Sequence, residues 1–311
     1  SVLNTSPNLK KDLRSIRENG EPEIHERVDL RAWTALGIGG LADLLIRCRS
    51  ADGLQRAIDV LATHGQPWLV LGAGSRLVPP DRGLRSPVLN LSGSLGLWEL
   101  DLDGAVAGGG ANLAQLSRAA ARTGLSGTEG LIGSGSSVGG AVQAACMGHL
   151  QFAAVLDWLE VARPGRTIER IQLPDRRGKR GSIDLDLDRR VVVRARLQLV
   201  GEGTPEESTK ASLRSRHRAQ RQPRSAEPLF ADPIEGRAES LLIDTECVDL
   251  KVGGARISDR YPNRIITSKT ARAADVLELT RLARDRVMER RDISLETAIC
   301  FVDEDGRAVD L

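Results

Sequence analysis

The first part of the chain alternates short apolar runs with one amphipathic segment. Residues 43–49 and 68–72 are apolar runs of strand length, and the second run ends in a glycine. Between them, Ser50 can cap a helix over 51–63, in which apolar side chains recur at helical spacing. Another short apolar run follows at 88–91. This β-α-β rhythm predicts a small α/β subdomain.

A second unit begins with a strand over 104–110 that runs into glycines. Asn112 is a suitable cap for a helix over 113–123, and Gly124 suits the position just past the end of that helix. Apolar runs then predict two further strands, at 156–162 and 191–200. The second unit is therefore also a mixture of strands and helices.

A polar stretch rich in Gly, Pro and Glu at 201–208 marks a boundary. Beyond it, the patterns predict an arginine-rich helix (209–221), a β-rich stretch (251–267), a long amphipathic helix (273–290) and a closing strand (293–302). We therefore divide the chain into a polar lead-in (1–24) with room for one short helix, a first subdomain (25–95), a second subdomain (96–205) and a C-terminal domain (206–311).

Composition narrows the classes of function. The 311 residues carry 44 basic and 42 acidic side chains, a near-balance that gives no reason to expect nucleic-acid binding. Four cysteines and four histidines are scattered without metal-ligand spacing, so we predict no metal site and read the cysteines as buried cytosolic thiols. No apolar run approaches 20 residues, and the first 20 residues do not resemble a signal peptide. We expect a cytoplasmic protein without a membrane span, and a monomer or weak dimer.

Three glycine-rich segments carry the candidate chemistry. Without a Cβ, glycines let main-chain N–H groups approach a polyanion closely, and serine hydroxyls can add donors. Any one segment alone is as consistent with an ordinary turn as with a phosphate-binding loop. None of the three fits a P-loop or a Rossmann fingerprint. Together they predict a diphosphate cradle made of Gly72, Ala73, Gly74, Ser75, Arg76, Leu77, Gly109, Gly133, Ser134, Ser136, Ser137, Val138, Gly139 and Gly140.

Four longer stretches, taken in order, resemble one family. They are TALGIGGLAD (34–43), WLVLGAGSRLV (68–78) with Asp81 and Gly83 after it, GLSGTEGLIGSGSSVGGAV (124–142) and VGGARISDRYPNRIITSKTARAADVLEL (252–279). The last resembles the pattern I-G-G-A-x-V-S-x-x-H-A-N-F-I-V-N. The family is that of the UDP-N-acetylenolpyruvoylglucosamine reductases (MurB-type), and the resemblance covers roughly residues 30–302.

The resemblance implies a fold and an activity. It implies an α+β protein with a two-part FAD-binding fold of the vanillyl-alcohol-oxidase type and a C-terminal α+β substrate domain. In the family, a hydride passes from NADPH to FAD and then to a nucleotide sugar, UDP-N-acetylglucosamine-enolpyruvate, in the synthesis of peptidoglycan precursors. A serine protonates the carbanion-like carbon, while a glutamate and an arginine stabilise the developing enolate. Arg180 is the arginine candidate, and Arg218 and Asn263 match substrate-binding positions.

The sequence departs from the family at both proton-handling positions. The family's S-A-G-S-x-F-K-N-P reads SAEPLFADP at 225–233, so Pro228 stands at the serine. The family's L-E-x-E-V reads LETAI at 295–299, so Ala298 stands at the glutamate. Proline has neither a hydroxyl nor an N–H to donate. Glu227 and Glu296 are possible substitutes, and Glu296 would share a face with Ala298 if both lay on one strand.

These departures leave three hypotheses open. The first is a peptidoglycan-precursor reductase, or a close derivative, whose activity is impaired or altered. The second is a catalytically silent flavin- or nucleotide-binding protein with a regulatory or scaffolding role. The third is a flavin oxidoreductase with a different substrate.

Overall fold

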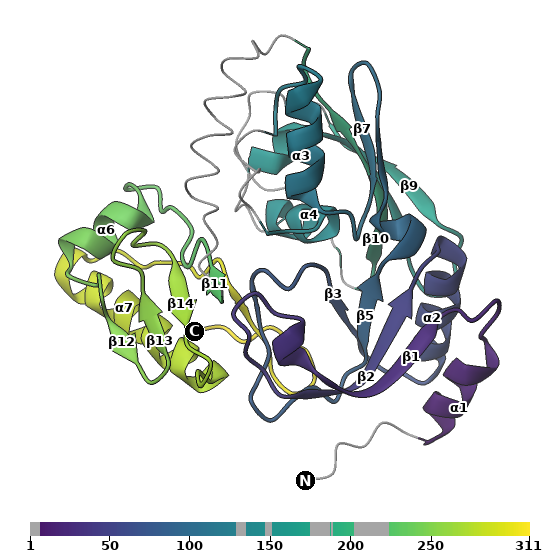
Figure 1. Cartoon of the computed structure of the whole chain (residues 1–311), viewed down its shortest axis with the longest axis horizontal. Helices are drawn as coiled ribbons and strands as arrows, with labels where there is room; N and C mark the ends of the chain where they lie inside the picture. The colour runs from purple at the N-terminus through teal and green to yellow at the C-terminus, as the bar shows by residue number, and fades with distance from the viewer. Residues whose placement is uncertain (1–6, 129–134, 147–150, 175–186, 188, 202–223) are drawn as a thin grey trace.

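The computed structural model describes residues 7–128, 135–146, 151–174, 187, 189–201 and 224–311. Two sheets with their helices lie together on one side of the molecule, and a third sheet with its helices lies beside them (Figure 1). In the described part of the chain, no helix is long and apolar enough to cross a membrane.

The first sheet has the strand order β1-β2-β5-β3. Its strands are β1 (Glu23–Asp29), β2 (Leu41–Cys48), β3 (Leu69–Leu71) and β5 (Val88–Leu91). Strand β5 pairs in parallel with β2 and with β3, while β1 is antiparallel to β2. Helix α2 (Ala51–Thr63) begins as predicted, with the Ser50 hydroxyl accepting the Gly53 N–H at 3.1 Å. The β-α-β interpretation of this segment is therefore confirmed.

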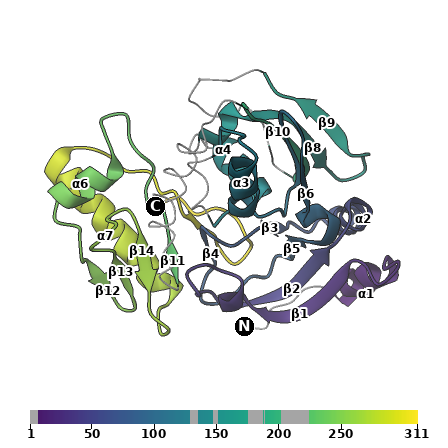
Figure 2. The same cartoon turned by 45° about the horizontal axis from the view of Figure 1, so that its top comes forward.

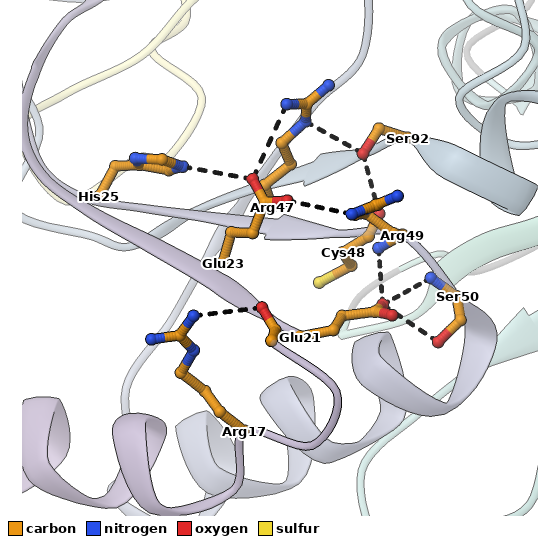
Figure 3. A network of polar contacts seen from close by, with 10 residues as sticks. Arg17, Glu21, Glu23, His25, Arg47, Cys48, Arg49, Ser50 and Ser92 are labelled. Atoms are coloured by element: carbon orange, nitrogen blue, oxygen red, sulfur yellow. Dashed lines mark hydrogen bonds and ion pairs between the residues drawn. The ribbon is translucent and has the colours of Figure 1, made fainter.

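The polar lead-in is fastened to the start of α2. Helix α1 (Pro7–Ser15) buries Leu9 and Leu13 in the same core as α2. The Glu21 carboxylate then accepts the N–H groups of Arg49 and Ser50, at 2.7 and 2.6 Å (Figure 3). The carboxylate thereby fixes the chain at the N-cap of α2 and at the residue before it.

The second sheet is antiparallel throughout, with the order β6-β7-β10-β8-β9. Its strands are β6 (Trp98–Leu100), β7 (Gly104–Gly108), β8 (Leu156–Ala162), β9 (Glu169–Gln172) and β10 (Val191–Gln198). Helices α3 (Leu113–Arg122) and α4 (Val138–Cys146) lie over one face of this sheet (Figure 2). As predicted, Asn112 caps α3 and Gly124 follows it with φ +81°. Three short 3-10 helices lie in the connections between these elements, at Leu30–Ala32, Gly93–Gly96 and Gln151–Ala154.

The third sheet has the order β11-β14-β13-β12 and packs against two helices. Its strands are β11 (Ser225–Ala226), β12 (Lys251–Val252), β13 (Ala255–Ile257) and β14 (Ile265–Thr267), and its helices are α6 (Ala238–Asp244) and α7 (Ala273–Arg291). The long amphipathic helix is thus confirmed, with Val276, Leu279, Ala283 and Val287 fully buried. The predicted arginine-rich helix over 209–221 lies outside the described residues.

The closing strand predicted over 293–302 is wrong in its extent. Only Cys300–Phe301 forms a strand, β15, which pairs in parallel with β4 (Leu77–Val78) of the first subdomain. Before it, the chain makes one isolated bridge, between Thr297 and Phe230, and then bends. The segment pairs first with Phe230, through Thr297, and then with β4, through Cys300 and Phe301. A single continuous strand would not reach both.

The C-terminal domain is tied to the first subdomain by long-range contacts. The Asp81 carboxylate accepts the N–H groups of Ala273 and Ala274, at 2.8 and 3.1 Å, and so caps helix α7 from the other domain. The Thr267 hydroxyl donates to the Leu36 carbonyl at 2.5 Å. Together with the β15–β4 pair, these contacts hold the third sheet beside the loops that follow β3.

Candidate functional site

The three glycine-rich segments meet in space. A Cβ built at Gly72 would lie 2.1 Å from the Ser137 hydroxyl oxygen, so the first and third segments touch only because position 72 has no side chain. The Gly139 N–H donates to the Gly109 carbonyl at 2.7 Å, which joins the third segment to the second. Residues from three separate parts of the chain therefore surround one place.

The N–H groups at this place fall into two sets. In the described part of the chain, those of residues 73–76, Ser136 and Ser137 donate to no partner. By contrast, Val138, Gly139 and Gly140 donate to the Ala111 carbonyl, the Gly109 carbonyl and the Ser137 hydroxyl. The N–H groups without a partner among the described residues thus lie in the turn after β3 and at the start of the third segment. Residues 138–140 shape the site and do not supply its N–H groups.

The serine hydroxyls take part in the scaffold. Ser137 caps α4 by accepting the Gly140 N–H at 3.2 Å, and the Ser136 hydroxyl donates to the Ser137 carbonyl at 3.1 Å. Both side chains are buried. The Ser136 donor is therefore already engaged. The Ser137 oxygen is an acceptor in the cap and keeps its own proton for another partner.

Arg76 brings a positive charge to the same place. Its guanidinium donates to the Gly140 carbonyl at 3.2 Å and so spans from the first segment to the third. Burial lowers the pKa of this guanidinium, an effect that nearby Cys300 opposes, but an arginine stays charged near neutral pH. A cation beside N–H groups that have no partner among the described residues, in a cradle that a Cβ at Gly72 would fill, fits the diphosphate of a dinucleotide such as FAD.

Several predicted site residues lie outside the described residues. These are Gly133 and Ser134 of the third segment, the arginine candidate Arg180 and the substrate-position Arg218. Their predicted roles stay predictions.

The two altered positions lie side by side. The Ala298 N–H donates to the Leu229 carbonyl at 2.8 Å, directly beside Pro228. Two residues later, the Cys300 N–H donates to the Arg76 carbonyl at 2.7 Å. One short segment therefore runs from the altered positions to the glycine-rich loops. Pro228 is half-buried and Ala298 is 7% exposed.

The two proposed substitutes have different surroundings. Glu296 is exposed while Ala298 is buried, so the continuous strand on which they were expected to share a face is not formed. Glu227 lies against Arg264, whose Nε donates to Oε2 at 2.9 Å and whose Nη2 donates to the same oxygen. That carboxylate oxygen is an acceptor for two N–H groups.

Asn263 has a structural position. Its Oδ1 accepts the Phe230 N–H at 2.9 Å, and its Nδ2 donates to the Phe230 carbonyl at 2.8 Å. The amide therefore fixes the stretch that contains Pro228. Its predicted contact with substrate would have to use the remaining N–H of the amide group.

Sequence reasoning missed the role of Arg264. The signal available was an arginine at the start of the apolar run RIIT, at the position where the quoted pattern has phenylalanine. An arginine there has to be paired if the strand is buried, as β14 is. Nothing in the local pattern named Glu227 as the partner.

Cysteines and acidic residues do not assemble into a metal site in the described residues. All four cysteines are free thiols; Cys48 and Cys247 are buried, but Cys300 is exposed, contrary to the prediction that all were buried.

A charged cavity of about 570 Å³ lies between the first subdomain and the C-terminal domain, and Asp29, Gly40, Asp81, Lys269 and Arg272 are among the residues that line it. Both carboxylates there are already engaged, Asp29 with Arg31 and Asp81 with α7.

Comparison with known proteins identifies the family. Residues 42–171 match the FAD binding domain, and residues 219–302 match the UDP-N-acetylenolpyruvoylglucosamine reductase C-terminal domain. The chain is 32% identical over 291 residues to the reductase of that name from Acidiphilium cryptum and 30% identical over 282 residues to that from Heliobacterium modesticaldum, covering 91% and 90% of those proteins and 88% and 89% of itself. The crystal structure of the Thermus caldophilus reductase superposes with a TM-score of 0.69 at 34% identity, over 89% of this chain and 98% of that one. The expected α+β fold with an FAD-binding domain is thereby confirmed, and the chain belongs to the UDP-N-acetylenolpyruvoylglucosamine reductase family.

Proposed function

We propose that this chain is a flavoprotein that binds FAD and accepts hydride from NADPH, but reduces UDP-N-acetylglucosamine-enolpyruvate slowly. The family and its FAD-binding domain support the first part of the proposal. The observation that supports the second part is the hydrogen bond from the Ala298 N–H to the Leu229 carbonyl, because it brings the two altered positions close together. The proposed compartment is the cytoplasm, where NADPH and UDP-sugars occur.

Cofactor binding would rest on this chain's main-chain donors. The N–H groups of residues 73–76, Ser136 and Ser137 would hold the diphosphate, with the Arg76 guanidinium neutralising part of its charge. Bound FAD would supply the hydride chemistry. The residues of the protein would bind, orient and manage protons around it.

The missing groups act on the second half of the reaction. Hydride addition to an α,β-unsaturated carboxylate leaves negative charge that must be stabilised and then protonated. Pro228 holds no transferable proton, and Ala298 holds no carboxylate. A positioned general acid typically contributes about 10²–10⁴-fold in rate. The Glu227 carboxylate already accepts a hydrogen bond from Arg264, and the Glu296 side chain is exposed. Neither carboxyl group therefore replaces the missing proton donor.

An anaerobic two-step experiment tests the proposal. The purified protein should be yellow, and NADPH should bleach the flavin absorbance. Addition of UDP-N-acetylglucosamine-enolpyruvate should then restore the colour only slowly. A colourless protein that FAD cannot reconstitute would remove the whole proposal. Rapid recovery with the enolpyruvyl substrate would remove the claim of slow reduction and leave an ordinary reductase.

A further inference from the structure

The cavity between the first subdomain and the C-terminal domain is enclosed by four separate segments of the chain. These segments contribute Asp29 with Arg31, residues 39–41, Asp81 with Arg82, and residues 269–272. Its volume of about 570 Å³ lies within the range of pockets that hold small ligands, roughly 300–1,000 Å³. The cavity is therefore large enough for a molecule of nucleotide size.

The cavity lies away from the predicted diphosphate cradle. Strands β2 and β3 run in the same direction, and Leu45 of β2 is level with Leu69 of β3 because both pair with Val88. Leu41, in the cavity wall, stands four residues before this level, whereas Gly72, in the cradle, stands three residues after it. Seven residues of strand span on the order of 20 Å. A ligand in the cavity would thus be separate from one in the cradle.

Both carboxylates in the cavity wall are already neutralised. The two oxygens of Asp29 accept hydrogen bonds from the Arg31 guanidinium, at 3.0 and 2.6 Å. The two oxygens of Asp81 accept one N–H each from Ala273 and Ala274, at the start of α7. Neither carboxylate is therefore left to neutralise the other basic side chains of the wall.

The remaining basic side chains of the wall have weak partners or none. Lys269 makes no ion pair or side-chain hydrogen bond in the described part of the chain. Arg82 is 87% exposed, and its Nη1 lies 3.7 Å from Glu304, whose other oxygen has a closer arginine at 2.5 Å. The Arg272 Nε lies 3.7 Å from Asp81. With four basic and two acidic side chains, the wall has an excess of positive charge.

We propose that this cavity binds a small phosphorylated molecule, whose diphosphate lies against Lys269 and Arg82. A concave wall with an excess of one charge attracts counter-ions, and both lysine and arginine bind phosphate oxygens. A diphosphate matches the excess, since each of its phosphates is ionised near neutral pH. Lys269 belongs to the C-terminal domain and Arg82 to the first subdomain, so the ligand would join the two. The inference goes beyond the proposed function and does not depend on the flavin.

Isothermal titration calorimetry of the whole purified protein with sodium diphosphate tests the proposal. Excess FAD keeps the cradle occupied, and sodium chloride at equal ionic strength is the blank. We expect saturable binding to wild type, with a dissociation constant at least about 10-fold higher in Lys269→Gln/Arg82→Gln. If that double variant does not fold, Lys269→Gln alone takes its place.

Titration with ADP separates the two sources of a diphosphate. Binding tighter than that of inorganic diphosphate, and weakened by the same double variant, assigns the cavity to a nucleoside diphosphate. Equal or weaker binding, weakened in the same way, assigns it to the diphosphate group alone. Succinate is the comparison for carboxylates, and succinate binding as tight as that of diphosphate would overturn the phosphate assignment.

A matched control removes the same charge elsewhere. Arg122 and Arg281 are exposed and do not line the cavity, so Arg122→Gln/Arg281→Gln should bind diphosphate as wild type does. Both double variants should melt within about 2 °C of wild type, because the altered side chains are on the surface. The proposal is overturned if wild type shows no saturable binding, or if both double variants bind equally. Failure of the proposed function would show separately, as a colourless protein whose diphosphate binding is intact.

Discussion

The Ser137 hydroxyl faces the Cα of Gly72 so closely that a Cβ at position 72 would lie 2.1 Å from Oγ. The two residues are 65 positions apart in the chain, yet their contact closes the predicted diphosphate cradle. Ser137 cannot simply turn away, since the same oxygen accepts the Gly140 N–H and so caps α4.

Gly72→Ala should therefore weaken FAD binding. The new methyl group has to push Ser137 aside, which disturbs the cap of α4 and the spacing between the loops. We expect the dissociation constant for FAD to rise by about 10-fold or more and the unfolding free energy to fall by about 1–3 kcal/mol. Titration of apoprotein with FAD, followed by absorbance, measures the first effect. Gly135→Ala is the control, because its Cβ would meet Ser75 at an ordinary 3.4 Å. Equal losses in both variants would contradict the argument.

Asp81→Asn should loosen the contact between the domains. The carboxylate caps α7 by accepting the Ala273 and Ala274 N–H groups, and it carries a negative charge at the positive end of that helix. We expect a loss of about 1–2 kcal/mol in unfolding free energy, measured by urea denaturation. Asp285→Asn on the same helix is the control, because that side chain is 61% exposed. A variant at position 81 as stable as this control would rule out the capping role.

The stability of the second sheet should depend on pH through Glu160. Burial raises the pKa of this carboxyl, but hydrogen bonds from Arg170 and Arg194 outweigh burial and hold it below its ordinary value. A lowered pKa in the folded state means that Glu160 stabilises the protein above the unfolded pKa, near 4.3, and that this stabilisation is lost as the pH falls through the folded value.

Glu160→Gln should therefore cost about 1–2 kcal/mol at pH 7, and the difference from wild type should shrink steadily below about pH 4. Urea denaturation across pH 3–7 measures both quantities. Glu99→Gln, at an exposed position of the same sheet, should stay close to wild type at every pH. A constant difference between Glu160→Gln and wild type over the whole range would show that the charge of Glu160 is not the cause.

Restoring the family's residues should restore the second half-reaction. Pro228→Ser supplies a hydroxyl and Ala298→Glu supplies a carboxylate, at positions that Leu229 and Ala298 hold together by a hydrogen bond. We expect the double variant to reoxidise NADPH-reduced flavin with the enolpyruvyl substrate about 10²–10⁴-fold faster than wild type. Stopped-flow absorbance at the flavin band measures the rate. Pro228→Ala is the control for removal of the proline alone, and a rate as high as that of the double variant would defeat the proton-donor interpretation.

The helices and their ends could be predicted from the sequence because the interactions that start and stop a helix involve residues close together in the chain. Ser50 and Asn112 cap helices that begin at the next residue, and Gly124 takes the left-handed conformation past α3, as the pattern indicated. The glycine-rich segments and the family motifs could also be found in the sequence, because their chemistry needs particular residues at particular spacings. The closing strand was misread, since its path depends on Phe230 and β4, which are remote in sequence.

By itself, the sequence determined the family, the α+β class, most of the helices and strands, and the two positions, 228 and 298, where the chain departs from the family's motifs. The tertiary structure alone decided which N–H groups have no partner among the described residues, that Asp81 caps a helix of another domain, and that Glu227 pairs with Arg264. The physical reason is the range of the interactions. Caps and hydrophobic periodicity act within one or two turns of chain, whereas hydrogen-bond partners and buried charge pairs are chosen only when distant segments pack together.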